Sequence, residues 1–109
     1  MKYLTRQEEL ILLTVFHLRD NAYLVTIRKH LKDNSRRNWS LGAVYVPLER
    51  LLKKRYLSMN IGGPNARRGR NEIKYYRLAQ LGLKALEETR EIHDVMWAQF
   101  SPTGYKLKI

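Results

Sequence analysis

The spacing of apolar residues changes in the middle of this chain, and that change limits the fold more than any other feature. Between residues 39 and 54 apolar side chains recur every three or four positions, which is the period of a helix. After Arg55, the residues Leu57, Met59 and Ile61 alternate with polar ones, which is the period of a strand. The sequence therefore predicts helices followed by a small β structure.

The helix predicted from Ser40 to Lys54 has distinct inner and outer faces. Ser40 is a good N-cap, because its side chain can accept a hydrogen bond from a backbone N–H one turn later. The apolar stripe consists of Val44, Leu48, Leu51 and Leu52. The outer face has small or aromatic residues near its start and cations near its end: Ser40, Ala43, Tyr45, Val46, Glu49, Arg50, Lys53 and Lys54. This face is typical of a recognition helix in a DNA major groove, since a helix N-terminus favours anions. An ordinary amphipathic helix with a solvated basic face is the alternative.

Two shorter helices are predicted before this one. Thr5 and Glu8 form a capping box that begins a helix running to about Arg19. Apolar residues between positions 24 and 31 define a second short helix, and a polar connection over 33–38 leads to the third. Two helices joined in this way form a helix-turn-helix pattern.

Residues 57–61 and 73–78 are predicted to form a β-hairpin, with the segment GGPNARRGRN between its strands. A helix-turn-helix followed by such a hairpin is the winged-helix architecture, and the basic tip carries Arg67, Arg68 and Arg70. From Glu49 to Lys74 there are eight cations and two acids, a net charge of +6 out of +11 for the whole chain. This concentration of positive charge indicates a polyanionic partner.

The last predicted helix, residues 79–100, differs from the basic region. It has two cations against four acids, and its apolar residues cover more surface than a small core could bury. At 22 residues it would be about 33 Å long, close to the roughly 34–36 Å between successive half-sites on a duplex. We interpret it as a dimerisation helix; the alternative is a helix folded back on its own domain. The expected fold is mainly α with a small β-hairpin (α+β): a winged helix-turn-helix domain over 1–78, a C-terminal dimerisation helix over 79–100 and a short tail over 101–109.

Several protein classes do not fit the composition. The chain has no cysteine, and its apolar run LILLTVF is too short to span a bilayer, so we expect a cytoplasmic protein with no membrane partner. The three histidines, His17, His30 and His93, show no metal-ligand spacing, and no catalytic motif is present. We therefore expect no enzyme activity, no metal and no cofactor.

The run LGAVYVPLERLLKKRYL, preceded by NAYLVTIRKHL and followed by KYYRLAQLGLKAL, resembles the PadR family of transcriptional regulators, in its short branch with one C-terminal helix. The resemblance covers Leu4 to about Trp97. It implies a homodimeric winged-helix protein that binds double-stranded DNA at a pseudo-palindromic operator, usually as a repressor, and releases it in response to a small molecule or another signal. Family sequences usually have glycine where this chain has Leu24 and Arg55. A left-handed Arg55 would be strained by roughly 1–2 kcal/mol. The alternative is a different exit from the helix that adds this cation to the hairpin side.

The resemblance also implies the DNA-binding residues. At matching positions, the start of the recognition helix would face DNA, and the hairpin arginines would hold phosphates or enter the minor groove. Three further cations, at the end of the helix and on the hairpin, complete the set, and the forked side chain of Arg50 could read guanine. The predicted residues are Ser40, Gly42, Ala43, Tyr45, Val46, Arg50, Lys54, Arg67, Arg68, Arg70 and Lys74.

A small aromatic or cationic ligand is a further expectation from the resemblance. In the family's multidrug-sensing branch, a tryptophan on the dimerisation helix stacks on flat cationic drugs between subunits. Here Trp97 lies one turn from that register, and His93 occupies it. The predicted groove contains Phe16, His93, Asp94, Met96 and Trp97. Packing between two subunits explains the same residues and is the interpretation that we favour.

A winged helix can also be a protein-interaction or RNA-binding module without a specific operator. In this chain the basic hairpin and the acidic last helix are separate segments. Such segregation of charge favours duplex DNA, because a protein-interaction module would not need it.

Overall fold

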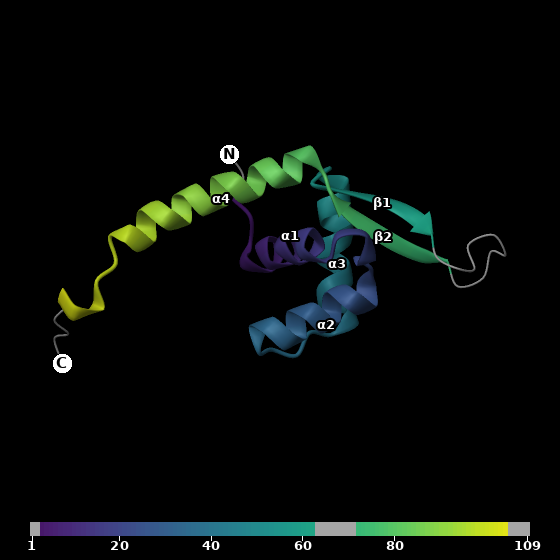
Figure 1. The fold of residues 1–109 in the computed structure, drawn as a ribbon, viewed down its shortest axis with the longest axis horizontal. Helices are drawn as coiled ribbons and strands as arrows, with labels where there is room; N and C mark the ends of the chain where they lie inside the picture. The colour runs from purple at the N-terminus through teal and green to yellow at the C-terminus, as the bar shows by residue number, and fades with distance from the viewer. Residues whose placement is uncertain (1–2, 63–71, 105–109) are drawn as a thin grey trace.

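The computed structural model describes residues 3–62 and 72–104. Within these residues the α-helices surround a small core, and an antiparallel hairpin projects from one side (Figure 1). The predicted fold, mainly α with a small β-hairpin, is confirmed as a winged helix. The elements in chain order are α1 (Arg6–Leu18), η1 (Arg19–Asn21), α2 (Leu24–Ser35), α3 (Leu41–Lys53), β1 (Leu57–Gly62), β2 (Ile73–Leu78), α4 (Gln80–Ala98) and η3 (Pro102–Gly104).

The predicted starts of α1 and α3 are confirmed. The backbone N–H of Glu8 donates to Thr5 Oγ1 at 3.1 Å, and the backbone N–H of Thr5 donates to Glu8 Oε1 at 2.9 Å. At α3, the N–H of Ala43 donates to Ser40 Oγ at 3.1 Å. These bonds satisfy N–H groups that have no partner inside the helix, so they fix where each helix begins.

Helix α2 is longer than predicted. The polar connection was expected to begin at Asp33, but the helix continues to Ser35. Ser35 Oγ donates to the carbonyl of Leu31 at 2.6 Å, and Asn34 Nδ2 donates to the carbonyl of His30 at 2.8 Å. The indole N–H of Trp39 then donates to Ser35 Oγ at 2.9 Å. Residues that favour turns here bond back to their own helix, which extends it by three residues beyond the prediction.

Helix α3 ends in a Schellman motif with arginine at the position that usually holds glycine. Arg55 has φ 63°, so of the two helix ends left open by the sequence the chain adopts the left-handed one. Its N–H donates to the carbonyl of Leu52 at 3.0 Å, and the N–H of Tyr56 donates to the carbonyl of Leu51 at 3.0 Å. These two bonds define the motif. The conformation costs about 1–2 kcal/mol for a residue with a Cβ.

The core lies where the first three helices meet the base of the hairpin. The first strand residue, Leu57, and Tyr76 of β2 are buried beside the helices. Pro47, inside α3, is also buried. Proline has no backbone N–H, so the position in the helix that lacks this donor faces the core. The remaining buried apolar residues are Ile11, Leu12, Val15, Ala22, Ile27, Leu31, Trp39, Val44, Leu48 and Leu51.

The hairpin is joined to the helices by its backbone. Its strands pair antiparallel, from Leu57 opposite Leu78 to Gly62 opposite Ile73. The N–H of Tyr76 donates to the carbonyl of Ala22 at 2.8 Å, so β2 is also bonded to the segment that enters α2. This bond fixes the position of the hairpin relative to the helix-turn-helix.

Helix α4 has two halves with different surroundings. In its first half, a Cβ at Gly82 would lie 2.1 Å from the carbonyl oxygen of Tyr56, so only glycine permits this close approach. Beyond it, α4 passes α1 and extends away from the domain (Figure 1). The helix ends at Ala98, two residues before its predicted end, and its 19 residues span about 28 Å. The first half therefore lies on its own domain and the second half leaves it. Among the described residues, no helix is both long enough and apolar enough to cross a membrane.

Candidate nucleic-acid interface

The N-terminal half of α3 has an open outer surface. Ser40, Gly42 and Ala43 are exposed, and 41% of Tyr45 and 59% of Val46 is accessible. A Cβ built on Gly42 would meet no atom within 4 Å. The opposite face of the same helix, with Val44, Leu48 and Leu51, is buried. The helix is therefore anchored by one face and presents small side chains at its free end.

The structure brings one hairpin cation to this surface. Lys74 Nζ, on β2, lies 5.9 Å from the centre of the Tyr45 ring, which is cation–π range. The same ammonium is 4.0 Å from Glu49 Oε1. Burial, followed by the charge of Glu49 and by Tyr45, raises the pKa of Tyr76 to about 12, so this phenol stays neutral beside the surface. Helix α3 and the hairpin thus share a polar junction.

Two predicted DNA-binding cations lie elsewhere, at the far end of α3. Lys54 Nζ is 2.9 Å from Glu8 Oε2, and Arg50 Nε is 3.5 Å from the same oxygen. Glu8 is 1% exposed, whereas Lys54 and Arg50 keep about a third and a half of their side chains accessible. The structure therefore places both cations in an ion-pair cluster with α1.

Glu8 is ionised in this cluster. Its burial acts to raise its pKa, but the N–H of Thr5 and the charges of Lys54 and Arg50 outweigh burial and lower the pKa below 4.5. Sequence reasoning identified Glu8 only as a capping residue. Its partner Lys54 is 46 positions away, and no local pattern connects them.

Three of the predicted residues, Arg67, Arg68 and Arg70, belong to the segment 63–71 and lie outside the described residues.

A groove of about 490 Å³ separates α1 from α4. Of the five residues predicted for a ligand groove, Phe16, His93 and Trp97 line it. Asp94 instead pairs with Arg90 at 3.8 Å, and Met96 lines a separate hollow. The groove also contains residues that the sequence did not indicate: Glu9, Leu13, Leu83, Leu86, Glu87 and Arg90. The acids that face the groove are therefore Glu9 and Glu87, and His93 Nε2 lies 3.6 Å from Glu9 Oε2.

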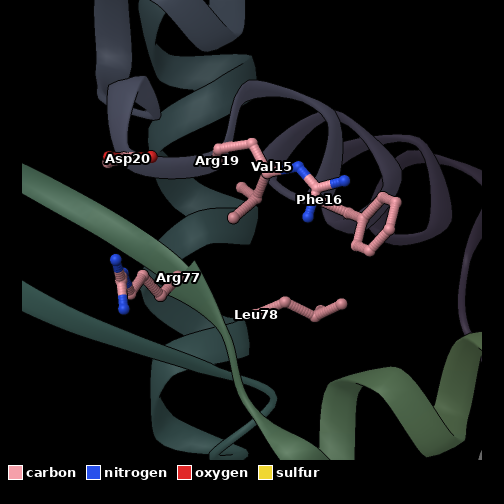
Figure 2. Close-up of a pocket in the computed structure, with 6 residues that line it drawn as sticks. All are labelled: Val15, Phe16, Arg19, Asp20, Arg77 and Leu78. Atoms are coloured by element: carbon pink, nitrogen blue, oxygen red, sulfur yellow. The ribbon is translucent and has the colours of Figure 1, made fainter.

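A second pocket, of about 290 Å³, lies between the end of α1 and the end of β2 (Figure 2). Its two arginines do not converge. The guanidinium of Arg19 lies over the ring of Phe16, 4.9 Å from its centre, while that of Arg77 points away on the opposite side of the pocket (Figure 2). The arrangement does not form a two-arginine site for one anion.

Two histidines that seemed unrelated in the sequence are neighbours. The rings of His17 and His30 lie 4.6 Å apart between α1 and α2. Burial and then the charge of His17 lower the pKa of His30, against a raising effect of Asp33. Within residues 3–62 and 72–104, no three potential metal ligands come together, so the pair is not part of a larger ligand cluster.

No protein-family model matches the sequence, and no curated protein matches it. Solved structures do match. A PadR family transcriptional regulator from Eggerthella lenta DSM 2243 is 25% identical with a TM-score of 0.68, covering 85% of this chain and 79% of that one. A PadR family transcription regulator from Clostridium difficile R20291 is 26% identical with a TM-score of 0.61, covering 82% and 95%.

A MepR variant from S. aureus, bound to an oligodeoxyribonucleotide, is 21% identical with a TM-score of 0.67, covering 92% of this chain and 68% of that one. At this identity the likeness concerns the fold alone. The resemblance inferred from the sequence motifs is nevertheless confirmed by the PadR structures, which match over 85% and 82% of this chain. The chain has the winged-helix fold of the PadR-family transcriptional regulators.

Proposed function

We propose that this chain is a DNA-binding transcriptional regulator that acts as a homodimer and represses transcription from a pseudo-palindromic operator. The observation that carries the proposal is the exposed N-terminal half of α3, anchored by its buried face and placed beside Lys74 of the hairpin. The MepR relative with the same fold, bound to an oligodeoxyribonucleotide, supports DNA as the partner.

In this proposal the start of α3 enters the major groove. The small residues Gly42 and Ala43 allow close approach, and the exposed side chains of Tyr45 and Val46 reach the base edges. The hairpin, with Lys74 and the arginines of its tip, contributes phosphate contacts and therefore a salt-dependent affinity. Arg50 and Lys54 contribute less, because a contact with DNA would compete with their bonds to Glu8.

A second copy of the chain is proposed to cover the free half of α4. The side chains of Val95, Met96 and Trp97 are 59–64% exposed there, and Phe16 on α1 is 48% exposed. A contiguous apolar surface of this kind on a small domain indicates a protein interface. A twofold pair of recognition helices matches a pseudo-palindromic site.

The α1–α4 groove is the proposed site of an effector, a planar aromatic cation. Trp97 and Phe16 supply aromatic faces, and Glu9 and Glu87 supply negative charge. Packing against the second subunit would use the same aromatic residues. Fluorescence separates the two cases, because Trp97 is 64% exposed whereas Trp39 is 6% exposed. Quenching by planar cations that disappears in Trp97→Phe supports the effector site, and unchanged emission across such a panel removes it for those ligands.

The direct test of DNA recognition is fluorescence anisotropy. DNA fragments from upstream of the chain's own gene are compared with random duplex of equal length at several salt concentrations. We expect tight binding to one fragment, two chains per site, a steep salt slope and less transcription from that fragment in vitro. Equal and weak binding to all duplexes would instead favour the protein-interaction or RNA-binding alternative.

A further inference from the structure

A pocket of about 290 Å³ lies between the start of α2, the recognition helix and the hairpin. It is lined by Tyr23, Leu24, Tyr45, Glu72, Ile73, Lys74 and Tyr76. Tyr45 and Lys74 belong to the DNA surface proposed above. Tyr23 does not, and neither the sequence pattern nor the fold comparison assigned it a role.

Tyr23 is held firmly at the edge of this pocket. Its carbonyl accepts the N–H of Ile27 at 2.8 Å, and its own N–H donates to Thr26 Oγ1 at 3.0 Å, so its backbone forms the first turn of α2. Its ring meets that of Tyr75 edge-on, with centres 5.4 Å apart. Because Ala22 is bonded to Tyr76 of β2, the hairpin and Tyr23 are fixed relative to each other.

The geometry of a duplex then determines what passes this pocket. One sugar–phosphate strand separates the major groove from the adjacent minor groove. If α3 occupies the major groove and the hairpin lies along the minor groove, that strand must cross the space between them. The pocket occupies this space, with Tyr45 on the α3 side and Lys74 on the β2 side.

We propose that this pocket receives the backbone of one DNA strand, and that Tyr23 and Lys74 contact its phosphate oxygens. The proposal rests on the DNA-binding function proposed above. Tyrosine hydroxyls donate hydrogen bonds to phosphate, and the Lys74 ammonium adds charge and releases a counterion. The contacts set affinity and register and leave the choice of sequence to α3.

The charges around the pocket give the proposal a distinctive signature. Glu72 lines the pocket, and its negative charge would repel a phosphate there. Lys74 Nζ also lies 4.0 Å from Glu49 Oε1. Removing the negative charge with Glu72→Gln should therefore tighten binding to every duplex about two- to threefold. A pocket that receives a cationic ligand would instead keep DNA binding unchanged in this variant.

The main test removes a single hydroxyl. Tyr23→Phe keeps the ring contact with Tyr75, and Tyr3→Phe is the matched control, since Tyr3 is an exposed tyrosine outside the pocket. We expect Tyr23→Phe to weaken binding to operator and random duplex by the same factor, about five- to tenfold, with an unchanged salt slope and melting temperature. Lys74→Met should lower the salt slope by about one, whereas Lys84→Met on α4 should leave it unchanged.

A modified duplex identifies the contact itself. In operator duplexes with one phosphate replaced by a methylphosphonate, one position should weaken wild-type binding and have little further effect on Tyr23→Phe. If wild type binds DNA and Tyr23→Phe binds it equally well, the proposed phosphate contact in the pocket is wrong and the proposed function still stands. Absence of wild-type binding to any duplex would overturn both.

Discussion

The two ends of α3 differ in what their polar residues do. At the N-terminal end, Ser40 caps the helix, a Cβ at Gly42 would meet no other atom, and Ala43 and Val46 are exposed. At the C-terminal end, Arg50 and Lys54 are bound to Glu8, and Arg55 closes the helix in a left-handed conformation. One end is open for a partner, and the other is built into the domain.

This difference shows that positive charge alone does not identify a binding surface. The C-terminal end has the cations that the sequence most readily connects with DNA, yet they neutralise a buried carboxylate. The N-terminal end has no cation between Ser40 and Glu49, but it combines small residues, free N–H groups and the neighbouring Lys74. Substitutions at the two ends should therefore separate DNA binding from stability.

The largest effect is expected at Gly42. Gly42→Glu places a bulky anion on the open surface, and we expect operator affinity to fall at least about 100-fold, through repulsion from phosphate and steric exclusion. Stability should stay the same or rise slightly, because the position is empty and an acid suits the first turn of a helix. Anisotropy and thermal melting measure the two quantities. Gly42→Gln, with the same bulk and no charge, should lose less affinity; equal loss of folding in both variants would contradict an open surface.

The converse effect is expected at Glu8. Glu8→Ala removes the acceptor of the Thr5 N–H and the counter-ion of Lys54, so the free energy of unfolding should fall by about 2–3 kcal/mol. Glu8→Gln keeps an acceptor and should lose about half as much. Urea unfolding measures both. At a temperature where both variants are folded, DNA affinity should stay within about threefold of wild type, and a larger loss would show that this end does meet DNA.

A smaller effect, of opposite sign, is expected at Arg55. Arg55→Gly relieves the left-handed strain and should stabilise the domain by roughly 0.5–1 kcal/mol, or about 3–6 °C in melting temperature. Lys53→Gly is the control two residues earlier, in the last turn of α3, and should destabilise by about 1 kcal/mol. A lower melting temperature for Arg55→Gly would mean that its side chain stabilises the fold by more than its backbone strain costs.

The smallest effect is a pH dependence at the same end. The pKa of Glu8 is lowered in the folded chain, so as the pH falls the unfolded chain binds a proton first. The stability from Glu8 is therefore complete above the ordinary carboxyl pKa of 4.5 and is lost as the pH falls through the folded value. The difference in melting temperature between wild type and Glu8→Gln should be constant near neutral pH and shrink below that range. A constant difference down to pH 3 would contradict an ionised Glu8.

Local features of the fold were predictable because each depends on residues close in sequence. The capping box of Thr5 and Glu8, the cap at Ser40 and the alternation after Arg55 all act within one turn or one strand. The end of α2 was placed three residues early because Asn34 and Ser35 usually favour turns. Their side chains bond to their own helix here, and Trp39 fixes that arrangement from outside the segment.

The site was predictable in part. The exposed face of α3 follows from helical period, and Phe16, His93 and Trp97 do share a groove. The cluster of Glu8 with Lys54, the pairing of Asp94 with Arg90 and the place of Tyr23 beside the hairpin could not be read in the same way. Each depends on how the helices and strands pack, or on which of several nearby residues a charged side chain pairs with. The spacing of apolar residues in the sequence gives no information about either.

The most direct test of the account asks which end of α3 touches DNA. A photo-crosslinking amino acid is placed at Val46, which is 59% exposed, or at Lys53, which is exposed near the other end. Each variant is then irradiated with labelled operator under saturating conditions. We predict a strong crosslink from position 46 and a yield near background from position 53. A stronger crosslink from position 53 would contradict the account, because it would place the end tied to Glu8 against the duplex.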